Sequence, residues 1–361
     1  MIRSFRIQPF RTGIACAALL AGVQAQAAPD HVDITWMSIT NMHFALGKQQ
    51  ILADGYFTRI PQEVFFGGAN GFDSTRRPMK PDLAAVTEVF DAIGGKSAVN
   101  LLLTGHSHFD HSFDTANWAR LSGARIIGSP TTCLQVRAAK IPARRCTPVF
   151  GGEKFTLETG VDMYVIRWNH SGDPEKNGKQ HDPFELREAP RPDATGAFRA
   201  GVGEDFPNGG GNRAYLFKVD GPQGQFSWLF QDSASAVDLR VPIIIDGRNF
   251  GAPLDNLRAA MQAARLESVD LWIATGGRDV AALVLPILKP KAYLPVHWDG
   301  LFGAFKAGPP QPYADAALET LLEESGVRPI IPVQYMDRWR LDAKGVQLLE
   351  NREIKQKLGF H

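Results

Sequence analysis

Apolar residues recur along the chain with two periods, one typical of strands and one typical of helices. Short apolar runs bounded by turn residues predict strands, and Gly47 with Lys48 supplies one such turn. Leu83, Val86 and Val89 instead recur at helical spacing. The expected strands span 32–38, 42–46, 50–54, 98–103, 124–128, 163–167, 214–219, 226–231, 271–274, 292–296, 328–332 and 338–341. The expected helices span 80–93, 133–139, 254–264, 280–288 and 314–325.

This alternation of strands and helices predicts one large α/β domain over residues 28–361, with no internal repeat and no linker. The pattern is interrupted at 171–212, a stretch rich in glycine, proline and charge that carries Phe184, Phe198 and Phe206. A loop of this length in a compact domain is usually functional or disordered, and its apolar residues need a surface to pack on. We expect this insertion to act as a lid over a functional cleft.

The first 27 residues have the order of a secretory signal peptide. Arg3, Arg6 and Arg11 form a positive region, residues 13–23 are apolar, and Ala25-Gln26-Ala27 resembles a cleavage site. The apolar run is shorter than the roughly 20 residues that span a bilayer, so a stable membrane anchor is not expected. The sequence therefore predicts a mature chain over 28–361 in the periplasm or outside the cell.

Charge and cysteine usage narrow the classes of partner. Removing the three arginines of the signal changes the formal net charge from +1 to −2, which does not favour nucleic acid as a ligand. Cys133 and Cys146 remain after cleavage, and in an oxidising compartment they are candidates for a disulfide. Two free thiols are the alternative, because sequence does not show that the Cα atoms come close enough.

The highest concentration of possible metal ligands lies directly after the apolar run that ends at residue 103. His106, His108, Asp110 and His111 put three of the nine histidines and a carboxylate into six residues. On a loop, His106 and His108 can face one point while Asp110 and His111 face another. Imidazole nitrogens and carboxylate oxygens suit Zn²⁺ and comparable divalent ions. We therefore expect two adjacent metal sites here.

The motif His-x-His-x-Asp-His, followed by later strand-end histidines and an aspartate, resembles the metallo-β-lactamase superfamily. The resemblance implies an α/β fold, a four-layer αβ/βα sandwich. It implies a first metal held by His106, His108 and His170, a second held by Asp110, His111 and His297, and Asp232 bridging both. His170, Asp232 and His297 each follow a predicted strand, where a sheet delivers ligands to one edge.

Further features extend the resemblance. Asp54 is similar to the early aspartate that supports the metal loop from behind its ligands. Gly276-Gly277 and residues 289–298 look like the branch of ascorbate-phosphate lactonases and phospholipase D-type phosphodiesterases. His43 and Trp298 are candidates for lining the substrate cleft. A histidine on a strand, such as His43, more often has a structural role, which is the alternative for this residue.

The expected function is metal-dependent hydrolysis of a small-molecule ester, lactone, phosphodiester or amide. Two divalent ions, zinc first with Mn²⁺ or Fe²⁺ as alternatives, lower the pKa of a shared water and so supply hydroxide. Asp232 would hold the bridging geometry, and Asp110 would pass a proton to the leaving group. The alternatives are an iron-dependent oxidoreductase of the same fold, and a β-lactamase.

Overall fold

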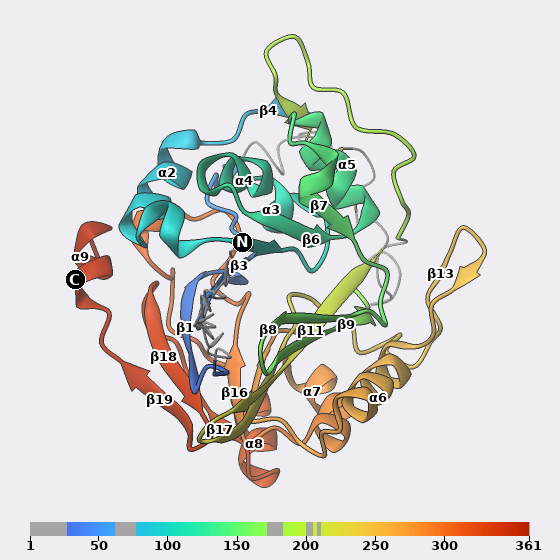
Figure 1. Ribbon diagram of the computed structural model, residues 1–361, viewed down its shortest axis with the longest axis vertical. Coiled ribbons are helices and arrows are strands. Elements are labelled where there is room, and N and C mark those ends of the chain that lie inside the picture. The colour runs from blue at the N-terminus through green and yellow to red at the C-terminus, as the bar shows by residue number, and fades with distance from the viewer. Residues whose placement is uncertain (1–26, 62–76, 172–182, 200–204, 208–210, 361) are drawn as a thin grey trace, which may run out of the picture.

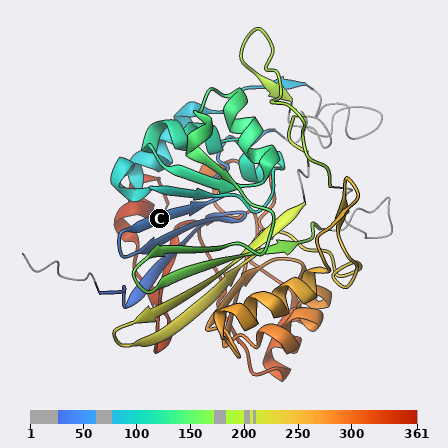
Figure 2. The same cartoon turned by 45° about the vertical axis from the view of Figure 1, so that its right-hand side comes forward.

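The computed structural model describes residues 27–61, 77–171, 183–199, 205–207 and 211–360. Two mixed β-sheets lie face to face, and helices cover the outer face of each sheet (Figures 1 and 2). This is the four-layer αβ/βα sandwich that was expected. The signal peptide predicted at 1–27 lies outside the described residues except for Ala27. Within the described ranges, no helix has the length and apolar character to cross a bilayer.

The two sheets contain eight and seven strands. The first runs in the spatial order β19 (Gly345–Leu349), β18 (Asp337–Asp342), β1 (His31–Ser38), β2 (Asn41–Leu46), β3 (Gln49–Ala53), β5 (Leu101–Leu103), β6 (Arg125–Gly128) and β7 (Cys146–Pro148). The second runs β17 (Arg328–Pro329), β16 (Ala292–Pro295), β15 (Leu271–Ala274), β12 (Gly224–Phe230), β11 (Asn212–Gly221), β9 (Val161–Trp168) and β8 (Lys154–Glu158).

The helices form the two outer layers. The first sheet is covered by α2 (Leu83–Ala92), α3 (Phe109–Ser112), α4 (Thr115–Ser122) and α5 (Pro130–Ala138), and the second by α6 (Pro253–Ala264), α7 (Gly277–Leu288) and α8 (Ala316–Glu324). Smaller elements are α9 (Arg352–Lys357), the strand pairs β4 (Pro78–Met79) with β10 (Phe198–Arg199) and β13 (Ile244–Ile245) with β14 (Arg248–Asn249), and 3-10 turns at Gly95–Ala98, Ala143–Arg145 and Phe305–Ala307.

Both faces of the second sheet are buried, which explains its nearly continuous apolar strands. Along β11, Tyr215 and Phe217 point into the core between the sheets, while Leu216 joins the core under α6 and α7. Phe217 stacks on Trp228 with ring centroids 4.4 Å apart, and Phe44 of the first sheet lies 5.8 Å from Trp228. These aromatic contacts join the two sheets.

Several predicted boundaries were wrong for local physical reasons. The helix expected from residue 80 begins at Leu83, because Pro81 precedes Asp82 and the Asp82 carboxylate accepts the Ala84 and Ala85 amides as an N-cap. The strand expected from Ala98 is shorter, because Gly95–Ala98 forms a 3-10 turn. Strands β8 and β19 and the helices α4 and α9 were not predicted.

The cysteine pair forms the disulfide that was considered. Cys133 of α5 and Cys146 of β7 are bonded, with a Cα–Cα distance of 5.5 Å. The bond ties the outer helix to the edge strand of the first sheet. A cross-link over so short a loop stabilises the fold by about 3 kcal/mol in the chain-entropy account.

Candidate metal centre

The expected ligands all follow strand ends at one edge of the sandwich. The motif begins after β5, His170 follows β9, Asp232 follows β12 and His297 follows β16. Strands β12, β15 and β16 are parallel, as are β3 and β5, so their carboxyl ends meet at the same edge. The structure therefore brings together seven residues that are up to 191 positions apart in the sequence: His106, His108, Asp110, His111, His170, Asp232 and His297.

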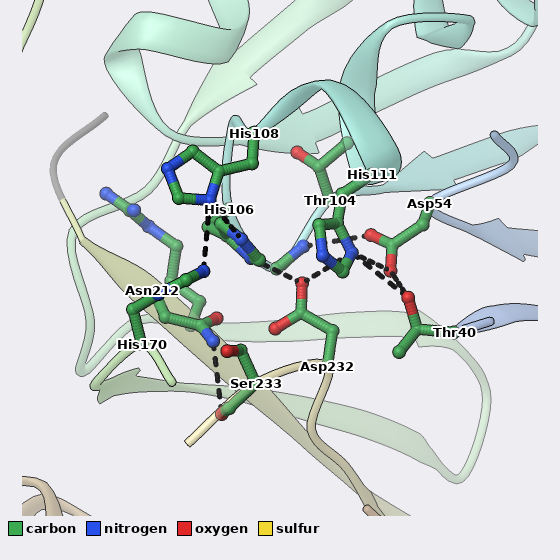
Figure 3. Close-up of polar contacts among 12 residues, drawn as sticks. Thr40, Asp54, Thr104, His106, His108, His111, His170, Asn212, Asp232 and Ser233 are labelled. Carbon is green, nitrogen blue, oxygen red and sulfur yellow. Dashed lines mark hydrogen bonds and ion pairs between the residues drawn. The ribbon is translucent and has the colours of Figure 1, made fainter. Parts of the chain in front are cut away.

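The first group consists of the three buried histidines His106, His108 and His170 (Figure 3). The His106 Nε2 atom lies 3.2 Å from His108 Nδ1, which lies 3.0 Å from His170 Nε2. A tetrahedral ion with Zn–N bonds of about 2.0–2.1 Å separates two ligand nitrogens by roughly 3.3 Å. The spacing of these nitrogens therefore fits a shared metal ion.

The second group consists of Asp110, His111 and His297. The Asp110 Oδ2 atom lies 3.1 Å from His111 Nε2 and 3.3 Å from His297 Nε2. Burial would raise the pKa of Asp110, but the adjacent His111 and His297 hold it well below its usual range. An ionised carboxylate with two imidazoles is a donor set that divalent ions of the zinc type accept.

Asp232 lies between the two groups and contacts one histidine of each. Its Oδ2 atom is 2.9 Å from His106 Nδ1 and 3.4 Å from His111 Nδ1 (Figure 3). In both rings the other nitrogen, Nε2, is the one that faces the remaining members of its group. Its Oδ1 atom is buried, with no hydrogen-bond partner in the described part of the chain. That anionic oxygen suits a cation, while the role of Asp232 as a bridge between two ions stays a prediction.

Asp54 contacts the second group from behind, as the resemblance implied. Its Oδ2 atom lies 3.0 Å from His111 Nδ1 and accepts the Thr40 hydroxyl at 2.6 Å. Burial raises the pKa of Asp54 to about 6. Burial would lower the pKa of His111, but the carboxylates of Asp110, Asp54 and Asp232 raise it well above its ordinary value. Burial lowers the pKa of His106, which favours its neutral, metal-binding form.

The turn between β1 and β2 holds the second group from another direction. The Ile39 carbonyl accepts the His297 amide at 3.0 Å. The Ile39 amide in turn donates to both oxygens of the buried Asp299 at 3.1 and 3.0 Å, and the Tyr335 hydroxyl donates to Asp299 at 2.7 Å. His297 has a φ of 66°, an uncommon left-handed conformation, so these contacts help to fix a strained position.

The first group is held by the ends of β9, β11 and β12. The Asn212 amide group donates to the carbonyls of Asn169 and Ser233 at 3.2 Å each. The Ser171 amide donates to the Ser233 hydroxyl at 2.7 Å. The loop that carries His170 is therefore joined to the loop that carries Asp232.

One expectation about the motif was wrong. Asp110 and His111 lie on the short helix α3 rather than on a loop. His43, a candidate for lining the substrate cleft, is directed elsewhere: its Nε2 atom donates to the Ala98 carbonyl at 2.6 Å, beside Asp33 and Arg338, as a structural strand residue would. Its alternation along β2 points it away from the core between the sheets, which Met42 and Phe44 enter.

Trp298 follows the ligand His297 but packs mainly inward. Its ring stacks on Trp36 with centroids 5.4 Å apart and meets Tyr313 edge-on at 5.6 Å. The side chain is only partly buried. A role in lining the substrate cleft stays a prediction.

Sequence reasoning gave no role to Thr40, Asn169, Asn212 or Gly105. The glycine carried a local signal, because it stands between the buried strand and the first histidine of the motif. A Cβ atom on Gly105 would lie 2.0 Å from Asp232 Oδ2, so no larger residue fits there. The polar residues carried no signal, because their partners are distant in sequence.

The described parts of the 171–212 insertion rest on the metal motif. The Ser107 hydroxyl donates to the Pro207 carbonyl at 2.6 Å, and the Gln135 amide donates to the Asp205 carbonyl at 2.8 Å. Phe198 and Phe206 are buried in a cluster with Phe109 and Phe113 of the motif region. Phe198 and Phe206 thus pack beside the candidate metal centre.

Comparisons with known proteins agree with a metal-binding chain but cover only part of it. No family model matches. A UPF0173 metal-dependent hydrolase of Pyrobaculum arsenaticum is 32% identical over 94 residues, 26% of this chain and 39% of that protein. One from Pyrobaculum islandicum is 31% identical over 70 residues, 19% and 31% of the two chains. The chain thus spans less than two fifths of the length of these curated relatives.

Solved structures of low similarity include Igni18, a metallo hydrolase from Ignicoccus hospitalis, with a TM-score of 0.49 and 12% identity, covering 86% of this chain and 99% of that one. The metallo-β-lactamase fold protein YhfI from Bacillus subtilis has a TM-score of 0.46 and 9% identity, with the same coverage. Two mixed sheets between outer helices, with the histidine motif at their shared edge, make this an α/β metallo-β-lactamase fold.

Proposed function

We propose that this protein is a metal-dependent hydrolase that holds two divalent ions, zinc in preference to Mn²⁺ or Fe²⁺. The observation that carries the proposal is that two adjacent groups of side chains could each hold a metal ion. One group consists of three histidines and the other of an aspartate and two histidines, and the ligand atoms of each group lie within 4.8 Å of one another. Such ions, when bound, activate water and polarise the carbonyl or phosphoryl oxygen under attack. His106, His108 and His170 would hold the first ion, and Asp110, His111 and His297 the second.

The side chains around the ions have distinct tasks in this proposal. Asp232 accepts the His106 Nδ1 proton, which leaves the lone pair of His106 Nε2 directed at the first group. Asp54 does the same for His111 through Nδ1. Asp110 is kept ionised by the adjacent imidazoles, so its Oδ2 atom would first take the proton that the attacking water loses and would then pass it to the leaving group.

The proposed substrate is a small ester, lactone, phosphodiester or amide. The resemblance to the lactonase and phosphodiesterase branch favours the first three of these bonds. The segment around Phe198 and Phe206 would act as a lid, since it already packs on Phe109 and Phe113 next to the motif. The disulfide between Cys133 and Cys146 supports export to an oxidising compartment, with a mature N-terminus near Ala28.

Elemental analysis of purified mature protein, combined with an activity panel, tests the proposal. We expect about two divalent ions per chain, and turnover of at least one chromogenic ester, lactone or phosphodiester that a chelator abolishes and added Zn²⁺ restores. The panel includes a chromogenic cephalosporin to detect β-lactamase activity. Iron in place of zinc together with oxygen consumption would assign the oxidoreductase alternative, and a metal-free chain with unchanged turnover would refute the proposal.

A further inference from the structure

A separate cavity lies beside the metal motif, between α4, α5 and the residues Pro192, Gly196, Phe198 and Phe206. Its volume is about 320 Å³, within the range of small-molecule sites. None of the seven candidate metal ligands lines it. We call it the α4–α5 cavity. Its two helices lie together in the upper part of Figure 1.

One part of the cavity is apolar. Phe113, Phe198 and Phe206 form a connected group, with the rings of Phe113 and Phe206 centred 4.9 Å apart and those of Phe198 and Phe206 6.2 Å apart. Val136 of α5 adds to this wall, and Leu83, which is 55% exposed, lies at the rim. Such a wall gains free energy by removing a hydrocarbon or aromatic body from water.

Another part is polar and cationic. Asn117 is buried, with 6% of it exposed, and its Oδ1 atom accepts Arg120 Nη1 at 2.7 Å. Arg120 Nη2 donates to the Ala139 carbonyl at 2.9 Å. Lys140, the residue after Ala139, lines the cavity as well, so Asn117, Arg120 and Lys140 all contribute to its wall.

The polar part of the cavity wall has one buried donor without an acceptor. The Nδ2 atom of Asn117 is buried and has no hydrogen-bond partner among the residues that the structure describes. No acidic side chain of the described residues lines the cavity. Three cationic side chains line the cavity: Lys80, Arg120 and Lys140. None of them takes part in an ion pair within the described ranges. A buried amide donor without an acceptor is costly, so a ligand oxygen at this point would be stabilising.

We propose that the α4–α5 cavity is a second ligand site, and that its ligand is a carboxylate with an apolar aliphatic body. The carboxylate would accept from Asn117 Nδ2 and Lys140, and the body would lie against Phe113, Phe198 and Phe206. A charged head recognised by an amide and a cation, next to an apolar wall, is the chemistry of a medium-chain fatty acid. This site goes beyond the proposed hydrolase activity and does not require it.

Isothermal titration of the metal-loaded protein with three probes tests the proposal. Decanoate carries both parts of the expected ligand, decanol lacks the charge, and acetate lacks the body. We expect saturable binding of decanoate, binding at least about tenfold weaker for decanol, and none measurable for acetate, because one charge-assisted hydrogen bond contributes about a factor of ten. Equal binding of decanoate and decanol, or no binding of decanoate, would overturn the proposal.

Two variants separate this cavity from other places where a carboxylate could bind. Ala138→Phe places a ring in the cavity from α5, and we expect it to abolish decanoate binding. Lys140→Gln should weaken binding about tenfold, while the matched control Arg125→Gln, on the exposed end of β6, should leave it unchanged. Metal content and the unfolding midpoint show that each variant is folded. Decanoate binding that survives Ala138→Phe would place the ligand at the metal ions or elsewhere, and would refute the assignment.

Discussion

The two halves of the candidate metal centre are held in different ways. His106, His108 and His170 are all buried, and the loop that carries His170 is held by the ends of neighbouring strands in the second sheet. In the other half, the His297 side chain is 22% exposed and its backbone is left-handed. Its position depends on the turn at Ile39, which is itself held by Asp299.

This difference shows how unequally two adjacent sites can be supported. In the first group, His170 is held by three strand ends of the second sheet that lie side by side, while His106 and His108 follow β5 of the first sheet. The second group depends on a turn that contacts His297 through Ile39 and His111 through Thr40. Single polar substitutions should therefore weaken the two halves separately, except at Asp232, which contacts both.

The largest effect is expected from Asp232→Asn. An amide cannot accept the His106 Nδ1 proton and also present a second anionic oxygen, so both halves should lose metal affinity. We expect kcat/KM on the best panel substrate to fall by about 100-fold or more, as for loss of a strongly coupled partner of a metal site. Elemental analysis beside the kinetics measures both effects. Two retained metals with parental activity would show that Asp232 is no metal-centre residue.

The next effect comes from a matched pair, Asp299→Asn and Asp238→Asn. In the first variant, the new side-chain NH₂ group would face either the Ile39 amide or the Tyr335 hydroxyl, which loosens the His297 turn. Asp238 accepts a hydrogen bond from Asn169 in the loop before His170. We expect each variant to lose about 10- to 100-fold in affinity for one of the two metals.

Competition titration with a zinc chelator resolves the two affinities, and EPR after cobalt substitution shows which donor set is altered. Asp299→Asn should change the signal of the aspartate and two-histidine site, and Asp238→Asn that of the three-histidine site. Identical losses from both variants would mean that the halves are not supported independently.

A smaller effect is expected from Thr40→Val, which keeps the side-chain shape and removes the hydroxyl. Asp54 then loses a 2.6 Å donor in a buried place, which destabilises the fold by about 1–3 kcal/mol. Chemical unfolding gives that free energy. Thr40→Ser restores the hydroxyl and should recover most of the stability, so a serine variant as unstable as valine would point to packing instead.

The smallest effect on the metals is expected from His43, which lies outside the centre. Burial lowers the pKa of His43 from 6.5 to about 4. Between pH 6.5 and pH 4 the unfolded chain therefore binds a proton at His43 that the folded chain does not bind. The contribution of neutral His43 to the free energy of unfolding is complete above pH 6.5 and decreases as the pH falls from 6.5 to 4. The side chain is half-buried, so the loss is at most about 3 kcal/mol.

His43→Gln keeps a donor for the Ala98 carbonyl and removes the titration. Urea unfolding at pH 7.5 and pH 5 should show a smaller pH dependence in this variant than in the parent, with unchanged metal content. An equal pH dependence would assign the effect to other groups, and a loss of metal would contradict the position of His43.

The sequence by itself determined the features that depend on local order. Apolar periodicity predicted most strands and helices to within a few residues, and the spacing of His106 to His111 predicted a metal-binding loop. The resemblance to the metallo-β-lactamase superfamily pointed to His170, Asp232 and His297, and each of these residues follows a predicted strand, where a sheet gathers its strand ends at one edge. Cys133 and Cys146 are close in the sequence, so a disulfide between them could be considered.

Only the tertiary structure decided the features that join distant residues. Ile39 and Asp299 are 260 positions apart, and nothing in either neighbourhood marks the contact. Three further features depend on which faces of the sheets and helices pack together. They are the direction in which His43 points, the helix that carries Asp110, and the packing of Phe198 and Phe206 on Phe113. Strand period fixes alternation but not which side becomes the core. That choice is made by the free energy of packing the whole chain, which no local pattern contains.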